Sequence, residues 1–135
     1  MKVLRLASIF CKLAEQPESV VAVIIKGDQV MGVARREDAT EWGLPGGKVE
    51  PGEDLKEALV REVKEEANIF LDKDKLEHIY ETEDGPYLAH AFLYHGSVPD
   101  PEQGDAGPAE WISWDELLEG PFGEYNQAVK SLLGL

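Results

Sequence analysis

Three glutamates stand close together in the stretch REVKEEANI: Glu62, Glu65 and Glu66. The pattern of apolar residues around them predicts an amphipathic helix over 54–67. On that helix, steps of four and three residues from the core position Leu55 lead to Glu62 and Glu66. Two carboxylates therefore fall on the side of the helix that is expected to face the protein interior.

Such an arrangement is costly unless a cation compensates it. Carboxylates three and four residues apart on a helix repel each other, and the C-terminal end of a helix disfavours negative charge. A solvated charged face is the alternative, and it predicts glutamates opposite the leucines, where Lys56, Glu57 and Lys64 lie. A cluster of hard oxygen ligands with too few basic neighbours is typical of a Mg²⁺ or Mn²⁺ site.

The loop before this helix, LPGGKVEPGE, is rich in glycine and proline. Glycine lets a backbone turn sharply and approach a ligand closely, although a plain surface loop has the same composition. Glu53 or Asp54 can cap the helix that follows. The loop gains meaning from its spacing to the helix: five residues separate Gly47 from Glu53, and seven separate Glu53 from Arg61.

The segment GGKVEPGEDLKEALVREVKEEANI resembles the signature of the Nudix hydrolase family, Gly-x5-Glu-x7-Arg-Glu-U-x-Glu-Glu-x-Gly-U, where U is apolar. The resemblance covers 23 residues, Gly47 to Ile69. One position departs, because Asn68 stands where the family has its last glycine. Asparagine is the next-best residue for a left-handed helix cap, so the fold should be retained. The resemblance implies an α/β/α sandwich around a mixed β-sheet, within the MutT-like branch.

The resemblance also implies roles for the residues of the signature. Glu66 is expected to bind the metal, Mg²⁺ or Mn²⁺. Glu62 and Glu65 are expected to share the roles of metal ligand and general base. Arg61 is expected to orient a glutamate, with Glu53 as its support, and the alternative for Arg61 is an ordinary helix-surface pair with Glu65.

Further site residues lie outside the signature. The resemblance implies that the carbonyl of Gly46 is an additional metal ligand. It also suggests that Asp105 binds the metal, and Glu102 and Glu110 are the alternatives to Asp105 in this role. For substrate binding it suggests four residues, each with a simpler structural explanation: Arg35, Arg36, Tyr87 and Asn126. A solvated strand end explains the arginines nearly as well, and helix capping explains Asn126 equally well. His78, His90 and His95 alternate with apolar residues on expected strands and are assigned no catalytic role.

The activity implied is metal-dependent hydrolysis of a diphosphate linkage in a nucleotide, and a nucleoside triphosphate cleaved to monophosphate and pyrophosphate is the favoured substrate. Dinucleoside polyphosphates are the first alternative, because Tyr87 lies 18 residues after Ile69. ADP-ribose is the second alternative substrate, because Pro86 falls near, but not on, the proline that marks the ADP-ribose-cleaving group of the family. An alternative from a different functional class is a regulator of the same fold that binds nucleotides without hydrolysing them. The presence of Glu53 and all three helix glutamates favours the enzyme.

The elements that must position these residues alternate along the chain. Strands are expected at 19–26, 29–36, 76–83, 87–96 and 109–114, and helices at 54–67 and 125–133, with an apolar segment of helical spacing at 3–13. Strands interleaved with helices favour an α/β layered fold. Trp42, Trp111 and Trp114 are expected to pack in the core or at its rim.

Composition limits the remaining alternatives. The 135 residues fit one domain over 1–135, and the formal net charge of −14 disfavours binding to nucleic-acid polymers or anionic membranes. Cys11 is alone, which favours a reducing, cytoplasmic location. No stretch reaches transmembrane length. The apolar N-terminal segment could support a homodimer, although nothing in the sequence requires one.

Overall fold

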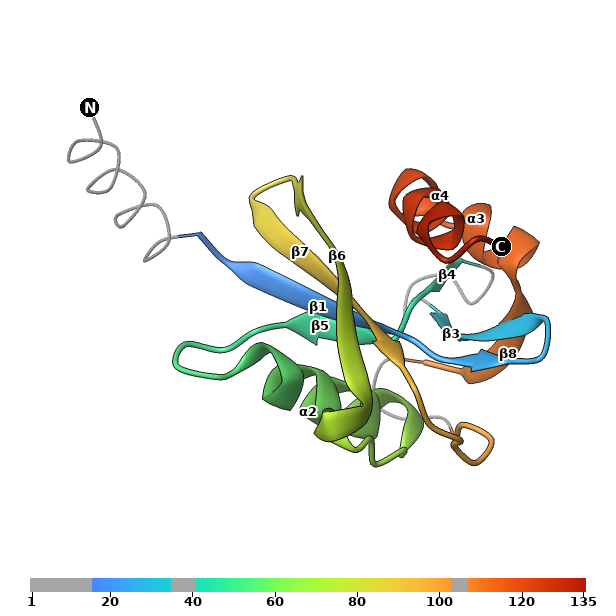
Figure 1. Ribbon diagram of the computed structural model, residues 1–135, viewed down its shortest axis with the longest axis horizontal. Coiled ribbons are helices and arrows are strands. Elements are labelled where there is room, and N and C mark those ends of the chain that lie inside the picture. Colours follow the sequence, from blue (N-terminus) through green and yellow to red (C-terminus); the bar gives the residue numbers. More distant parts are fainter. Residues whose placement is uncertain (1–15, 35–40, 103–106) are drawn as a thin grey trace.

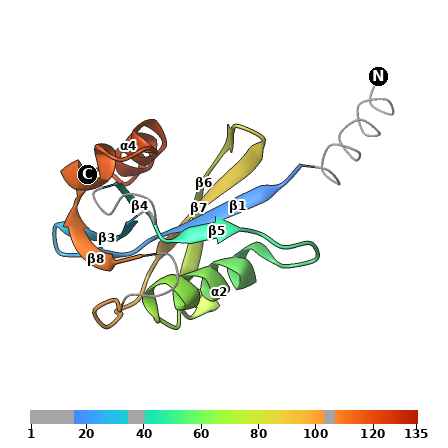
Figure 2. The same ribbon diagram turned by 180° about the vertical axis from the view of Figure 1, so that it is seen from behind.

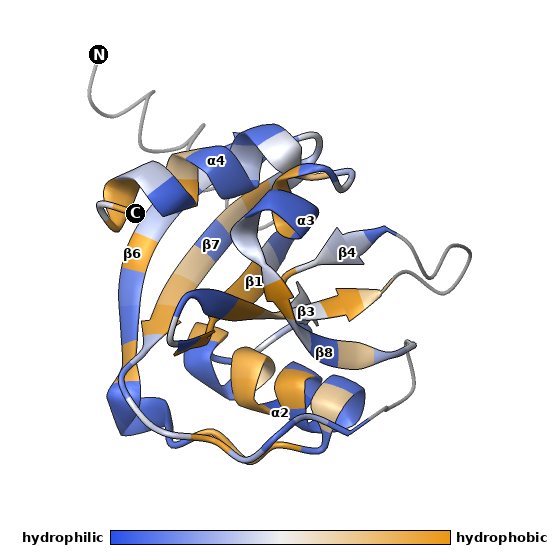
Figure 3. Ribbon diagram, turned by 90° about the vertical axis from the view of Figure 1, so that its right-hand side faces the viewer, coloured by the Kyte–Doolittle hydropathy of each residue, from blue (hydrophilic) through white to orange (hydrophobic). Residues whose placement is uncertain are grey.

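The computed structural model describes residues 16–34, 41–102 and 107–135. In it, helix α2 lies on one side of a layer of β-strands, and helices α3 and α4 lie on the other (Figure 1). The same three layers are seen from the side in Figure 3, with the strands between α2 and α4. This confirms the α/β/α arrangement expected from the sequence.

One sheet carries the elements around the helix glutamates. It consists of β5 (Gly46–Lys48), β1 (Glu18–Val23), β7 (Tyr87–Tyr94) and β6 (Leu76–Asp84), in that spatial order. Strands β1 and β7 are parallel, whereas β5 pairs with β1, and β6 with β7, in antiparallel fashion. The sheet is therefore mixed, and the short β5 is its edge strand.

The second sheet is built around β3 (Gln29–Ala34). Its partners are β2 (Ile25–Lys26), β4 (Trp42–Gly43) and β8 (Ala109–Ser113), all antiparallel to it. The strand expected over 19–26 is divided, because the chain changes sheets at Ile24: Val23 pairs with Leu93 of β7, and Ile25 pairs with Val30 of β3. A continuous β-branched run predicted extended backbone correctly but carried no signal for this change of partner.

Helix α2 spans Leu55–Ala67, close to the predicted 54–67. The carboxylate of Asp54 accepts hydrogen bonds from the backbone N–H groups of Lys56 and Glu57, so Asp54, rather than Glu53, is the N-cap. Asn68 ends the helix in the left-handed conformation, with φ 56° and ψ 36°. The substitution of asparagine for the glycine of the family signature is thus accommodated as expected.

The remaining helices are short. A 3₁₀ turn, η1, spans Lys73–Lys75, and α3 spans Trp114–Leu118 with Ser113 as its cap. Helix α4 spans Gly123–Leu132, which agrees with the expected final helix. Within the described residues, no helix is long and apolar enough to cross a lipid bilayer.

The core consists of two clusters, one on each side of the strand layer. Leu59 and Val63 of α2 pack with Val20 and Phe92 from β1 and β7. On the other side, α3 and α4 pack on the strands through Trp114, Leu117 and Val129. Trp42 and Trp114 are core residues, as predicted, and Trp111 packs at the edge of the first cluster. Burial of these apolar faces fixes α2 against β5 and β1 (Figure 2).

Three sequence predictions lie outside the described residues: the helical segment 3–13, the arginines Arg35 and Arg36, and Asp105.

Candidate active site

Helix α2 presents its glutamates to β5. The backbone N–H of Gly46 in β5 donates a hydrogen bond to Oε1 of Glu66, with an N···O distance of 2.7 Å. This short bond to a carboxylate joins the C-terminal half of the helix to the edge strand of the sheet. The position of Glu66 is therefore determined by a backbone group 20 residues away in the sequence.

Arg61 organises the other carboxylates of the signature. Its Nε and Nη2 donate to the two oxygens of Glu53 at 2.9 and 3.0 Å, in a bidentate ion pair. Its Nη1 donates to Glu62 at 3.0 Å, and Nη2 also reaches the carbonyl of Lys48 at 3.1 Å. The contact with Glu65, at 3.5 Å, is the longest of the set. A helix-surface pair with Glu65 alone does not describe this arginine, which holds two other glutamates.

The exposure of the three helix glutamates follows the expected pattern. The side chain of Glu62 is 17% exposed, Glu66 is partly buried, and the side chain of Glu65 is 44% exposed. Glu57, on the opposite face, is exposed. The prediction that Glu62 and Glu66 face the protein and Glu65 lies to the side is confirmed.

Burial changes the protonation of these groups. It raises the pKa of Glu66 to about 8; the Gly46 N–H opposes this effect, and the negative charges of Glu62 and Glu65 add to it. Burial also raises the pKa of Glu62, against the hydrogen bond from Arg61. The pKa of Glu53 is lowered, because Arg61 and the Glu50 backbone stabilise its charged form. The strongest disturbance is thus at Glu66, beside β5.

The donor set fits a divalent cation. Three carboxylates, those of Glu53, Glu62 and Glu65, contact the one guanidinium of Arg61, which is engaged most closely by Glu53 and Glu62. Within the described part of the chain, Glu66 receives one backbone N–H and no basic side chain pairs with it when it is ionised. Hard oxygen ligands with an excess of negative charge are what Mg²⁺ and Mn²⁺ prefer. Glu62, Glu65 and Glu66 are the residues that could hold such an ion.

Gly47 allows Glu62 to take its position. A Cβ atom added at residue 47 would lie 2.5 Å from the carboxyl carbon of Glu62. Any side chain there would therefore push this carboxylate away from its bond to Arg61. The first glycine of the signature is explained by this close approach between strand and helix.

A cavity of about 280 Å³ lies beside β5, where apolar residues of the α4 side form much of its wall. Two residues suggested for substrate binding, Tyr87 and Asn126, line it together with Gly46 and Gly47. The structure thus brings these four residues together, although they come from three separate elements. The cavity has the concave, mostly apolar character of a small-molecule site.

Asn126 is 1% exposed, and its Nδ2 has no hydrogen-bond partner among the described residues. A buried amide without a partner costs free energy that a ligand can recover. Because Asn126 lines the cavity, it offers a donor to a molecule bound there.

Sequence reasoning assigned no role to three other residues that line this cavity: Lys48, Phe122 and Tyr125. The Nζ of Lys48 lies 5.6 Å from the centre of the Tyr87 ring, so a positive charge stands at the cavity wall. The Gly-Gly-Lys sequence was a signal for Lys48, since a cation next to flexible backbone suits a phosphate. Nothing in the sequence distinguished Phe122 or Tyr125 from core residues.

Glu102 and Glu110 are the two alternatives to Asp105 as a metal ligand. Glu102 is exposed and accepts a hydrogen bond from Nδ2 of Asn68 at 2.6 Å, so it is tied to the end of α2. Glu110 is exposed on β8. The carbonyl of Gly46, expected as a metal ligand, belongs to the residue whose N–H holds Glu66.

Comparison with known proteins identifies the family of this chain. The model of the NUDIX domain matches residues 15–132. The CTP pyrophosphohydrolase of Escherichia coli K12 is 33% identical over 110 residues, which covers 76% of this chain and 80% of the relative. The 8-oxo-dGDP phosphatase NUDT18 of Homo sapiens is 45% identical over 60 residues, or 42% of this chain, but this covers only 19% of the relative's length.

Solved structures agree with the fold. A structure from a study of MutT of Aliivibrio salmonicida and Vibrio cholerae has a TM-score of 0.70 with this chain and 22% sequence identity. The match covers 87% of this chain and 97% of the other. The glutamates joined to β5, the arginine that orders them and the NUDIX-domain match over 15–132 lead to one identification. The chain belongs to the Nudix family and is similar to its MutT-like members.

Proposed function

We propose that this chain is a divalent-metal-dependent pyrophosphohydrolase that cleaves a nucleoside triphosphate to the monophosphate and pyrophosphate. One observation carries the proposal: Gly46 of β5 holds the partly buried Glu66 and also lines the same cavity as Asn126. A nucleotide bound there can place its base in the cavity and its phosphates against the glutamates. Since the edge strand carries no side chain at Gly46 or Gly47, the substrate can approach it closely.

Glu62, Glu65 and Glu66 would hold the Mg²⁺ or Mn²⁺. When bound, the ion neutralises phosphate oxygens and makes water more acidic. The reaction adds the oxygen of water to a phosphorus atom, breaks one P–O bond of the anhydride and releases one proton.

The chain's own residues would position the groups that react. Arg61 holds Glu62 at 3.0 Å while Glu53 fixes the opposite side of the guanidinium, so this carboxylate is ordered before substrate arrives. Glu65 is more exposed, and its one hydrogen bond among the described residues is the long one to Arg61, so its carboxylate can accept the proton of the attacking water. Positioned groups of this kind contribute to the rate mainly through orientation.

The base would be read by Asn126 and enclosed by apolar walls. The unpartnered Nδ2 can donate to a carbonyl oxygen or ring nitrogen of a base, while Leu44 and Phe122 supply apolar contact. Lys48 supplies a positive charge on the side of Gly47. Tyr87 lines the same cavity. It is the residue that would favour a dinucleoside polyphosphate over a nucleoside triphosphate as the substrate.

A panel of substrates tests the proposal. Purified protein with Mg²⁺ or Mn²⁺ is given CTP, dGTP, 8-oxo-dGTP, a diadenosine polyphosphate and ADP-ribose, and products are separated by anion-exchange chromatography. Monophosphate and pyrophosphate from at least one triphosphate are expected. Hydrolysis of the dinucleotide alone, or of ADP-ribose alone, would assign that compound as the substrate in place of a nucleoside triphosphate. Binding of nucleotide without any hydrolysis would make the chain a nucleotide-binding regulator.

A matched pair of variants tests the site. Glu66→Gln keeps the size of the side chain but removes its charge, and we expect loss of metal-dependent hydrolysis by about 100-fold or more. Glu57→Gln is the control, since Glu57 lies on the exposed face of the same helix and pairs with Lys73 at 3.5 Å. If both variants keep the parental rate, the glutamates of α2 are not the catalytic site.

A further inference from the structure

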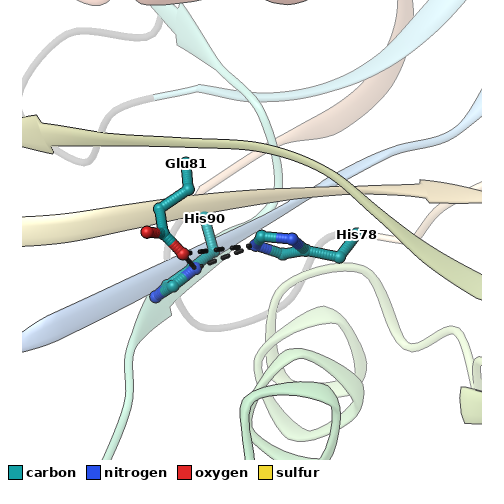
Figure 4. Close-up of side chains that lie close together, drawn as sticks. All are labelled: His78, Glu81 and His90. Carbon is teal, nitrogen blue, oxygen red and sulfur yellow. Dashed lines mark hydrogen bonds and ion pairs between the residues drawn. The ribbon is translucent and has the colours of Figure 1, made fainter.

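A second group of metal-ligating side chains lies on the hairpin of β6 and β7, outside the glutamate site. Nε2 of His78, Nδ1 of His90 and a carboxylate oxygen of Glu81 all lie within 4.8 Å of one another (Figure 4). The separations are 2.9 Å between the histidine nitrogens, 3.3 Å from His90 to Glu81 and 4.0 Å from His78 to Glu81. In the part of the chain that the structure describes, no other group of three such residues meets this criterion.

An irregularity in β6 brings these residues to one face. Residues 78 and 81 are an odd number of positions apart and would point to opposite faces of a regular strand. The pairing register shifts between His78 and Tyr80, so that His78 lies opposite Phe92 and Glu81 lies opposite His90. Because residues 90 and 92 share a face, the bulge places His78 and Glu81 on that face as well. Strand irregularities of this kind re-aim side chains, and here three ligands result.

The group is separate from the glutamates of α2. Gly47, Val20, His90 and Glu81 form one row across the sheet, from β5 through β1 and β7 to β6. Gly47 and His90 are therefore two strand spacings apart, or about 10 Å between their backbones. Helix α2 packs on β5 and β1. The glutamate site lies at the β5 edge, and the histidines lie toward the β6 edge.

A fourth residue fixes the proton on the buried histidine. Nε2 of His90 lies 2.6 Å from a carboxylate oxygen of Glu18, which can only accept, so Nε2 carries the hydrogen. In the neutral ring, Nδ1 then has a lone pair and faces both Glu81 and His78. Histidines that bind metals almost always donate their other nitrogen to such a carboxylate. Glu18 gives His90 the tautomer that a metal ligand requires.

The size of the triangle suits a tetrahedral ion. Zn²⁺ bonds to histidine nitrogen and carboxylate oxygen at about 2.0–2.1 Å, so two ligand atoms of a tetrahedral site lie about 3.3 Å apart. The separations of 2.9, 3.3 and 4.0 Å lie around that value, and the largest change needed is a shortening of the His78–Glu81 separation by about 0.7 Å. Two imidazoles and one carboxylate are borderline ligands that suit zinc better than magnesium.

We propose that His78, His90 and Glu81 form a binding site for a zinc-like divalent transition metal, supported by Glu18. The side chains of His78 and Glu81 are 39% and 51% exposed, whereas that of His90 is 4% exposed. The ion therefore enters from solvent, and its fourth position holds water. The bound metal ties β6 to β7 at the bulge and stabilises the hairpin.

Metal titration of the full chain tests this site. Zn²⁺ is added in isothermal titration calorimetry in the presence of excess Mg²⁺, which occupies hard oxygen ligands and competes poorly for imidazole. We expect one Zn²⁺ per chain and a higher melting temperature with Zn²⁺ than without. Co²⁺ used as a second probe should give the intense visible absorption of a four-coordinate ion.

Variants at exposed positions keep the test independent of folding. His78→Gln and Glu81→Gln should each weaken Zn²⁺ binding by at least about tenfold and abolish the Zn²⁺-dependent rise in melting temperature. Glu18→Ala should weaken Zn²⁺ binding by about 10- to 100-fold, because the hydrogen of the His90 ring would no longer be held on Nε2. The matched control is His95→Gln on the same hairpin, whose Nε2 pairs with Glu77 at 2.7 Å, and it should bind Zn²⁺ like the parent.

Two results would overturn the assignment. The first is an absence of Zn²⁺ binding in excess Mg²⁺, which would mean that the four residues form a hydrogen-bonded network alone. The second is equal Zn²⁺ affinity in the parent, His78→Gln and Glu81→Gln, which would place the ion elsewhere on the chain.

Discussion

Glu66 and Gly46 are joined by a 2.7 Å hydrogen bond between a partly buried carboxylate and a backbone N–H of the edge strand. This bond connects the two parts of the candidate active site, because Glu66 belongs to the acidic helix and Gly46 lines the cavity beside β5. It also stabilises the charged form of Glu66, but burial outweighs it, and the pKa of Glu66 rises to about 8. In the metal-free protein, burial therefore favours the protonated form of Glu66.

The raised pKa of Glu66 predicts how stability depends on pH. Between an unfolded pKa of 4.5 and a folded pKa of about 8, the folded state binds more protons than the unfolded state. The free energy of unfolding of the metal-free protein should therefore fall as pH rises from about 5 to 8, by an amount on the order of a few kcal/mol. The raised pKa of Glu62 acts in the same direction above pH 4.5, whereas the lowered pKa of Glu53 acts only below pH 4.5, outside this window.

Thermal unfolding in EDTA across this pH range measures the effect. Glu66→Gln should flatten the pH dependence relative to the parent, and Glu57→Gln should leave it unchanged. Excess Mg²⁺ should raise the melting temperature most at pH 8, because the metal binds the ionised carboxylate. A parental slope in Glu66→Gln would show that another group is responsible.

Arg61→Lys should separate the role of charge from the role of geometry. Lysine keeps the positive charge but cannot form the bidentate bonds to Glu53 and the bond to Glu62 at the same time. We expect kcat to fall by about 10- to 100-fold, with a smaller change in KM, because the ordering of Glu62 is lost. Lys64→Arg is the matched control, since Lys64 is exposed on the same helix. Equal kcat in Arg61→Lys and the parent would contradict a positioning role.

Gly47→Ala should impair activity through one methyl group. The added Cβ would lie 2.5 Å from the Glu62 carboxyl, so this flexible side chain must move away from Arg61. We expect the rate to fall by about 100-fold while the protein stays folded. Gly43→Ala is the control on neighbouring β4, where the new Cβ would meet Phe122 at an ordinary 3.6 Å. A similar rate for both variants would mean that the close approach of Gly47 has no part in catalysis.

Asn126→Leu should affect substrate binding more than stability. The substitution keeps the approximate volume and removes a buried Nδ2 that has no partner, so the free energy of unfolding should change by no more than about 1 kcal/mol. KM for the preferred nucleotide should rise by about 10- to 100-fold if the amide donates to the base. Gln127→Leu provides a control, because Gln127 is exposed on the same helix. An unchanged KM, measured by steady-state kinetics, would remove Asn126 from the substrate site.

Local sequence was sufficient for helix α2 and its ends. The apolar spacing around Leu59 and Val63 predicted the buried stripe, Asp54 supplied the N-cap, and Asn68 adopted the left-handed cap. Each of these features depends on residues within a few positions of one another, where backbone geometry is fixed by the helical repeat. The partial burial of Glu62 and Glu66 followed from the same repeat, without knowledge of the fold.

Contacts between distant segments were decided by the tertiary structure. The change of sheets at Ile24, the bond from Gly46 to Glu66 and the meeting of Tyr87 with Asn126 in one cavity all depend on how the sheets pair. Strand pairing is governed by register and burial over the whole domain, which a single sequence does not specify. The histidine group is a clear case, since only the bulge in β6 places His78 beside Glu81 and His90.

The sequence by itself determined an acidic helix with two carboxylates on its inner side, and the motif that relates this helix to the Nudix family. Only the tertiary structure decided what the helix faces and which other side chains gather around the sheet. The physical reason is range: helical periodicity and capping act over three to five residues, whereas β-sheet register joins residues such as Gly47, Val20, His90 and Glu81 from four separate strands.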